Sequence, residues 1–116
     1  MCIRDRYDIK ERTFRFAQRI LEIVEKLPNK PYCEVISRQL SKSGTSIGAN
    51  VEEADGTLTK KDFINKVCIA RKEAKETRYW LRIISGKYIE EKEISYDIKE
   101  CFELISILSA IINKSR

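Results

Sequence analysis

The sequence predicts an all-α protein, a single antiparallel up-down-up-down four-helix bundle that spans residues 1–116. Three observations support this prediction. The chain contains only 4 Gly and 2 Pro, which favours long helices over the tight turns of sandwiches and barrels. Apolar residues recur at spacings of three and four along four segments, as in helices with one buried face. The segments between them are short, so we expect consecutive helices to be antiparallel.

The first helix is expected over residues 7–27. Pro28 ends it, because the residue before a proline is pushed out of the helical region. Its apolar stripe consists of Phe16, Ile20, Ile23, Val24 and Leu27. The second helix is expected to begin at Pro31, which suits the first helical position, and to end near Ala54. Gly56 is expected to supply a left-handed cap after it.

The second helix contains a cluster of small residues at positions 43–50. Gly44 and Gly48 lie four residues apart and therefore share one face of the helix. A phosphate-binding loop would need a preceding strand and a Gly-Lys-Ser/Thr ending, and the sequence indicates neither. Two glycines lower the helix propensity by about 1–2 kcal/mol, so we expect close packing of another helix backbone to compensate.

The third helix shows the most regular pattern in the chain. Thr59 and Asp62 resemble a capping box at its start, and Gly86 ends it. Alternating spacings of four and three, typical of bundle packing, connect Phe63, Val67, Ala70, Ala74, Thr77, Leu81 and Ile84. The fourth helix is expected to begin near Ser95. It has the same spacing at Ile98, Cys101, Ile105, Leu108 and Ile112.

Composition argues against an enzyme, a metal site and a cofactor. The sequence has no histidine, which excludes a Ser-His or Cys-His nucleophile and the Glu-x-x-His di-metal sites of bundles. Four scattered cysteines without a CxxC pair are expected to be buried free thiols in a reducing compartment. Glutamates of the second and third helices are expected to pair with Arg71 and Arg78. No apolar run reaches about 18 residues, and the N-terminus lacks a signal-peptide core, so we expect a cytoplasmic protein with no membrane partner.

The net charge of +5 is unevenly distributed. Residues 60–87 carry nine Lys and Arg against three Asp and Glu, whereas residues 88–116 carry four against six. A basic helix binds phosphate groups by releasing counterions, although surface lysines often form only a solvated face. The residues expected to bind nucleic acid are Lys60, Lys61, Lys66, Lys72, Lys75, Arg78 and Arg82, and the first helix is expected to add Arg12, Arg15 and Arg19.

Two helices carry more apolar residues than one buried stripe needs. A wide stripe can mark a central helix. In a bundle of only four helices, however, each helix has a solvent face, so surplus apolar area favours an interface and a homo-oligomer. The residues expected at this interface are Tyr79, Trp80, Ile83, Phe102, Leu104, Ile107 and Ile111.

Two stretches of the sequence resemble the four-helix-bundle family encoded in 23S rRNA intervening sequences, whose members occur in bacteria. The first is RQL at 38–40 with SGTSIGANVEEA at 43–54, and the second is KDFI at 61–64 with IARKEAKETRYWL at 69–81. The resemblance implies an antiparallel four-helix bundle that assembles into a ring-like homopentamer. The family is similar to the accessory protein of diversity-generating retroelements, a basic pentamer that binds nucleic acid and a reverse transcriptase. Residues 1–6 depart from the family and resemble translated sequencing-adapter readthrough, so we expect them to be a non-native N-terminal extension.

These observations lead to two hypotheses about function. The first is a non-enzymatic homo-oligomeric scaffold, pentameric by the resemblance, that binds RNA or DNA, RNA in particular, through its basic third helix. The second is a protein–protein interaction module, in which the apolar surface recruits a partner protein and the basic face has no nucleic-acid ligand. Neutralising Lys72, Lys75 and Arg82 together distinguishes them, because only the first hypothesis predicts a loss of RNA binding with the oligomer intact.

Overall fold

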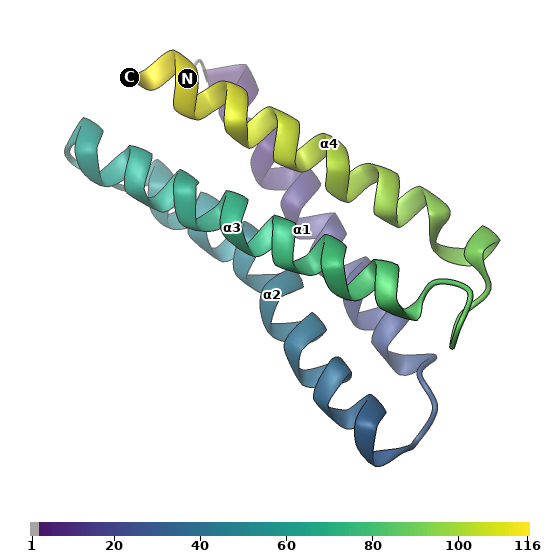
Figure 1. The fold of residues 1–116 in the computed structure, drawn as a ribbon. Coiled ribbons are helices and arrows are strands. Elements are labelled where there is room, and N and C mark those ends of the chain that lie inside the picture. Colours follow the sequence, from purple (N-terminus) through teal and green to yellow (C-terminus); the bar gives the residue numbers. More distant parts are fainter. Residues whose placement is uncertain (1–2) are drawn as a thin grey trace.

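Four long helices make up the part of the chain that the structure describes (Figure 1). This computed structural model describes the backbone of residues 3–116 and the side chains of residues 8–116. The helices are α1 (Ile3–Glu25), α2 (Pro31–Asp55), α3 (Lys60–Ile84) and α4 (Glu91–Ser115). Each runs antiparallel to the one before it, so the start of α1 and the end of α4 lie at the same end of the molecule. The predicted all-α four-helix fold is therefore confirmed, while the non-native extension expected at residues 1–6 lies largely outside what is described.

Most of the expected helix boundaries hold to within a few residues. Pro31 is the first residue of α2. The side chain of Thr59 caps α3 by accepting a hydrogen bond from the backbone N–H of Asp62 at 3.1 Å. The fourth helix begins at Glu91, four residues earlier than expected. Its first turn brings Ile94 into the core, and acidic residues there interact favourably with the helix dipole.

The left-handed cap predicted at Gly56 is wrong. Gly56 has a φ of −99°, and its backbone N–H reaches the carbonyls of Ala54 and Glu53 without a left-handed turn. The glycine with a positive φ among the described residues is Gly86, at +79° in the α3–α4 connection. Its N–H donates to the carbonyl of Ile89 at 2.7 Å, which closes that turn. Gly86 thus has the conformational role that the sequence assigned to Gly56.

One hydrophobic core is shared by all four helices. On α3 the predicted stripe is buried from Val67 to Ile84, and Phe63 at its start is half-buried. On α4 the buried face is wider than the periodicity suggested, because this helix borders both α3 and α1. Leu104 and Ile111, expected at an oligomer interface, are 0% and 9% exposed and belong to the core of the single chain. No helix of residues 3–116 is long and apolar enough to cross a membrane.

The backbones of α1 and α2 approach each other closely at two glycines. A Cβ atom placed on Gly44 would lie 2.7 Å from Cγ2 of Ile20. A Cβ atom on Gly48 would lie 3.3 Å from Oγ1 of Thr13. Ile20 is fully buried and β-branched, so it has little freedom to turn aside. This contact confirms the close helix packing that the glycine spacing predicted.

Replacing these glycines by alanine tests the close approach. Both substitutions raise helix propensity by the same amount, about 1 kcal/mol, so the difference between them isolates the clash. We expect Gly44→Ala to be about 1–3 kcal/mol less stable than Gly48→Ala, because a methyl group at position 44 overlaps the packed Ile20 side chain, whereas one at position 48 makes a tight contact with Thr13 that a small shift relieves. Urea denaturation followed by circular dichroism measures both free energies of unfolding. Gly56→Ala is the control, since its Cβ would meet only Glu53 O, at 3.8 Å. Equal urea midpoints for Gly44→Ala and Gly48→Ala would contradict the close packing of Ile20 against Gly44.

Candidate nucleic-acid interface

The outward side of α3 carries a row of exposed cations. Lys61, Lys72, Lys75 and Arg82 are exposed, and they are separated by 11, 3 and 7 residues. These intervals correspond closely to three, one and two turns of helix, so the four side chains project from one side. At about 1.5 Å per residue the row is roughly 30 Å long. Lys60, also exposed, begins the helix at one end of the row.

Two of the predicted nucleic-acid-binding residues lie at the edges of this row. Lys66 points towards α2, where its Nζ lies 3.7 Å from a carboxylate oxygen of Glu53. Arg78 leans towards α4, and its guanidinium carbon lies 5.5 Å from the ring centre of Phe102. We call Lys60, Lys61, Lys72, Lys75 and Arg82 the basic face, with Lys66 and Arg78 as its two borders.

The cations of α1 have a different environment, because each of those described is paired with a carboxylate. Arg12 donates two hydrogen bonds to Glu100, and Arg19 donates to Asp97 at 3.0 Å. These hydrogen bonds raise the pKa of both guanidinium groups. Carboxylate partners also lie within 4 Å of Lys10 and Arg15 on α1, and of Lys26 just after the helix ends. The arginines expected to extend the nucleic-acid interface from α1 are therefore compensated within the chain.

On α3 the expected pairing of arginines with glutamates does not form. Arg71 donates to the hydroxyl of Ser109 at 3.4 Å, and Glu76 accepts a hydrogen bond from Trp80 Nε1 at 3.4 Å. Of the eight cations between Lys60 and Ile84, only Lys66 has a carboxylate within 4 Å among the described residues. The positive charge of α3 is thus largely uncompensated.

The apolar residues expected at an oligomer interface do not form one surface. Tyr79 and Phe102 are each 57% exposed and lie beside the basic face. Trp80 and Ile83 are half-buried on α3, and half-buried Ile107 lies between α4 and α1. Sequence reasoning missed four further exposed apolar or aromatic residues on α1 and α2: Phe14, Leu21, Tyr32 and Val35. The sequence did indicate part of this surface. Phe14 and Leu21 are seven residues apart, so they share one face of the helix, and they lie outside the buried stripe.

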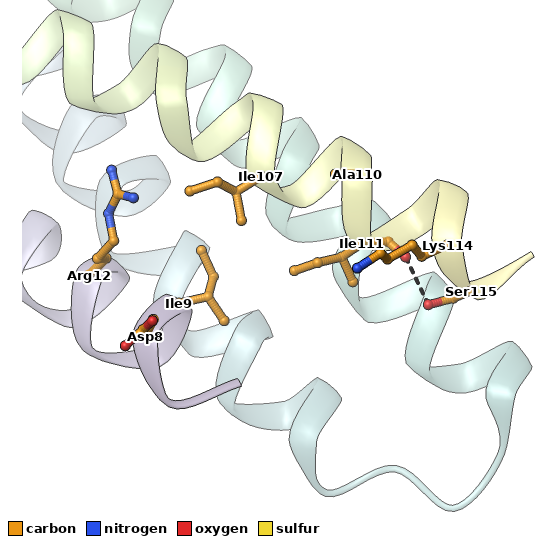
Figure 2. Close-up of a pocket in the computed structure, with 8 residues that line it drawn as sticks. All are labelled: Asp8, Ile9, Arg12, Ile107, Ala110, Ile111, Lys114 and Ser115. Carbon is orange, nitrogen blue, oxygen red and sulfur yellow. Dashed lines mark hydrogen bonds between the residues drawn. The ribbon is translucent and has the colours of Figure 1, made fainter. Parts of the chain in front are cut away.

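A groove separates α1 from α4 near the end of the bundle where α1 begins and α4 ends (Figure 2). Its volume is about 310 Å³, and its apolar lining includes Ile9, Ile107 and Ile111. Arg12 and Lys114 lie at its rim, as Figure 2 shows. The lining contains no nucleophile paired with a base.

The cysteines described by the structure are free thiols that lie apart from one another. Cys33 and Cys101 are buried, and Cys68 is half-buried. Cys101 Sγ donates to the carbonyl of Ala74 at 3.1 Å, and burial raises the pKa of this thiol to about 12. Only the thiolate is a nucleophile or a metal ligand. Between residues 8 and 116 no group of His, Cys, Asp and Glu is arranged to hold a metal ion.

Comparison with known proteins identifies relatives over nearly the whole chain. The family model described as "23S rRNA-intervening sequence protein" matches residues 5–110. The chain is also similar to the crystal structure of a protein of unknown function from the S23 ribosomal protein family of Bacteroides thetaiotaomicron VPI-5482. The two are 37% identical with a TM-score of 0.86, and the alignment covers 94% of this chain and 98% of the other. No curated protein matches the chain.

Thiol alkylation tests the assignment of Cys101 as an inert core residue. At pH 8 its thiolate is scarce, because the raised pKa lies about four units above the pH of the assay, and the side chain is 0% exposed. We expect iodoacetamide to leave Cys101 unmodified in the native protein and to label it fully in guanidinium chloride. Peptide mass spectrometry measures both states, and the half-buried Cys68 provides an internal comparison. Native labelling of Cys101 at the denatured rate would contradict this assignment.

Proposed function

The chain belongs to the family of 23S rRNA-intervening sequence proteins, and from this premise we propose that it is a non-enzymatic scaffold that binds nucleic acid, RNA in particular, through the basic face of α3. We also propose that it works in the cytoplasm as a homo-oligomer, with five copies as the state that the family resemblance implies. The protein contributes a rigid helical surface, and the ligand is held by its phosphate groups.

The observation that carries this proposal is the uncompensated charge of α3. A cation already paired with a carboxylate must give up that partner to bind a phosphate, which cancels most of the gain. Lys72, Lys75 and Arg82 have no carboxylate partner among the described residues, so they exchange only mobile ions for phosphates. The release of counterions from the nucleic acid then drives binding. The distinction between paired α1 cations and unpaired α3 cations favours α3 as the contact surface.

The exposed apolar residues support self-association. Phe14, Leu21 and Val35 are 59%, 46% and 47% exposed on α1 and α2. Within the described chain α1 and α3 lie diagonally across the core, with no pair of their Cα atoms within 8 Å. Copies that associate through Phe14 and Leu21 would therefore leave the basic face of α3 open. Repeating that face in each copy strengthens the field that attracts a polyanion.

Neutralising the centre of the basic face tests the nucleic-acid proposal. The variant Lys72→Gln/Lys75→Gln/Arg82→Gln should bind RNA more weakly. The slope of log K against log salt should fall by about 0.7 for each lost phosphate contact with a single strand, or about 2 in all. Fluorescence anisotropy across a salt series measures both quantities.

The matched control removes the same number of charges elsewhere. Arg15→Gln/Lys26→Gln/Lys92→Gln neutralises three cations that are each paired within the chain, so its RNA affinity should stay within about twofold. Equal losses of RNA affinity in the two triple variants would show that RNA binding depends on net charge alone. RNA binding that persists unchanged in molar salt would also contradict a phosphate-driven mechanism.

Sedimentation equilibrium at micromolar concentration tests self-association. A pentamer of the 13.6 kDa chain would have a mass of about 68 kDa, five times that of one copy. The variant Phe14→Glu/Leu21→Glu should shift the mass towards one copy, because two carboxylates would be buried without partners in the interface. Leu58→Glu, at a residue 98% exposed in the α2–α3 connection, is the control and should not change the mass. A wild-type protein that sediments only as a monomer would contradict the oligomer.

The protein-interaction alternative makes different predictions for the same variants. If the apolar residues recruit a protein partner, the Lys72/Lys75/Arg82 variant should capture that partner as well as the wild type does. In that case Phe14→Glu/Leu21→Glu should abolish capture of the partner. Neither variant should change the affinity of the protein for RNA.

A further inference from the structure

Two exposed aromatic rings lie on the basic face and at its border with α4. Tyr79 on α3 and Phe102 on α4 are each 57% exposed. A single exposed ring is common on protein surfaces. These two are distinctive because of their surroundings: Lys75 lies one turn before Tyr79 on the same helix, and Arg82 lies one turn after it.

Arg78 connects the two helices at this border. Its guanidinium lies over the Phe102 ring at 5.5 Å, and the ring is nevertheless more than half exposed. The same guanidinium has no carboxylate within 4 Å in the described chain. The contact is therefore a cation on a ring rather than an ion pair, and it brings a ring of α4 to the edge of the basic face.

The carboxylates near this border are each bonded to another group of the chain. Glu76 accepts a hydrogen bond from Trp80 Nε1 one turn along α3. On α4, Glu100 and Glu103 interact with Arg12 across the α1–α4 boundary. The border thus combines exposed rings with positive charge, which is the composition of surfaces that bind single-stranded nucleic acid.

We propose that Tyr79 and Phe102 stack against unpaired bases of a single RNA strand, whose phosphates contact Lys75 and Arg82. This inference rests on the proposed function and specifies its ligand. In a duplex the bases are stacked on one another, so their flat faces are not available to a protein ring. Charge attracts both single and double strands, whereas the two rings add affinity only for the single strand. The rings therefore shift the preference of the protein towards single-stranded RNA.

The test compares two RNAs across a small set of variants. An oligouridylate long enough to span the basic face presents unpaired bases, and a blunt RNA duplex of the same strand length presents none. The double variant Tyr79→Leu/Phe102→Leu keeps the apolar character of both sites and removes both rings. We expect it to bind the oligouridylate at least about tenfold more weakly, given the contribution of base–aromatic stacking, and to bind the duplex within about twofold of the wild type.

Two control variants separate the rings from the rest of the surface. Tyr79→Phe/Phe102→Tyr retains both rings and should bind the oligouridylate as the wild type does. Tyr96→Leu removes an exposed ring of α4, 74% exposed, whose neighbouring arginines are already paired with carboxylates of the chain, and should have no effect. Circular dichroism confirms that each variant is folded.

Trp80 provides a second readout that affinity alone does not give. It is the chain's one tryptophan, and its ring centre lies 5.3 Å from that of Tyr79. A base that stacks on Tyr79 should change the tryptophan emission when the oligouridylate binds, and the duplex should produce a much smaller change.

The outcomes distinguish this inference from the function on which it rests. Suppose that the wild type binds both RNAs. If the double ring variant then keeps its affinity for both RNAs, or loses affinity for both to the same extent, stacking is overturned while phosphate-driven binding stands. If the wild type binds neither RNA, the proposed function fails, and the inference fails with it. A selective loss for the oligouridylate in the ring variant, combined with a loss for both RNAs in Lys72→Gln/Lys75→Gln/Arg82→Gln, supports both.

Discussion

The close approach of α1 and α2 at Gly44 and Gly48 determines how the rest of the bundle is packed. With no side chain at these positions, Ile20 and Thr13 of α1 lie directly on the α2 backbone. On its other side α2 meets α3 through small polar groups, with Thr77 Oγ1 donating to Ser43 Oγ at 2.9 Å. Because α1, α2 and α3 are drawn together in this way, the large side chains of α4 supply much of the remaining core volume, and α1 and α4 meet less closely than sequential neighbours do.

The looser boundary between α1 and α4 explains where the ion pairs form. Arg12 and Arg19 cross it to reach Glu100 and Asp97, and the side chain of Asp97 is only 3% exposed. A carboxylate at that depth is tolerated because the Nε–H of Arg19 donates a bifurcated hydrogen bond to its two oxygens. These bridges occupy the cations of α1 and several acidic groups of α4. Apart from Lys66, the basic residues of α3 have no carboxylate partner in the described chain, so the same packing that defines the fold also leaves one surface strongly positive.

Much of the fold could be predicted from the sequence, since helical periodicity, Pro31, the Thr59 cap and the Gly44–Gly48 spacing all act locally. The wider buried face of α4 could not, because the spacing of apolar residues does not reveal how many helices a given helix touches. Leu104 and Ile111 were misplaced for that reason. The concentration of charge on α3 was visible in the sequence. Which cations are compensated depends on contacts between residues far apart in the chain, such as Arg12 with Glu100, and no local pattern encodes them.

The groove beside Ile107 also bears on how the molecule moves. Since α1 is attached mainly to α2, and α4 mainly to α3, the four helices behave as a strip whose two outer members meet edge to edge. Opening that edge breaks a few ion pairs and exposes Ile9 and Ile111, while the glycine-packed contact of α1 with α2 stays intact. Local opening of this kind has a much lower free energy than global unfolding. Slow local opening should therefore occur mainly between the first and last helices. The basic surface of α3 would keep its shape during this opening.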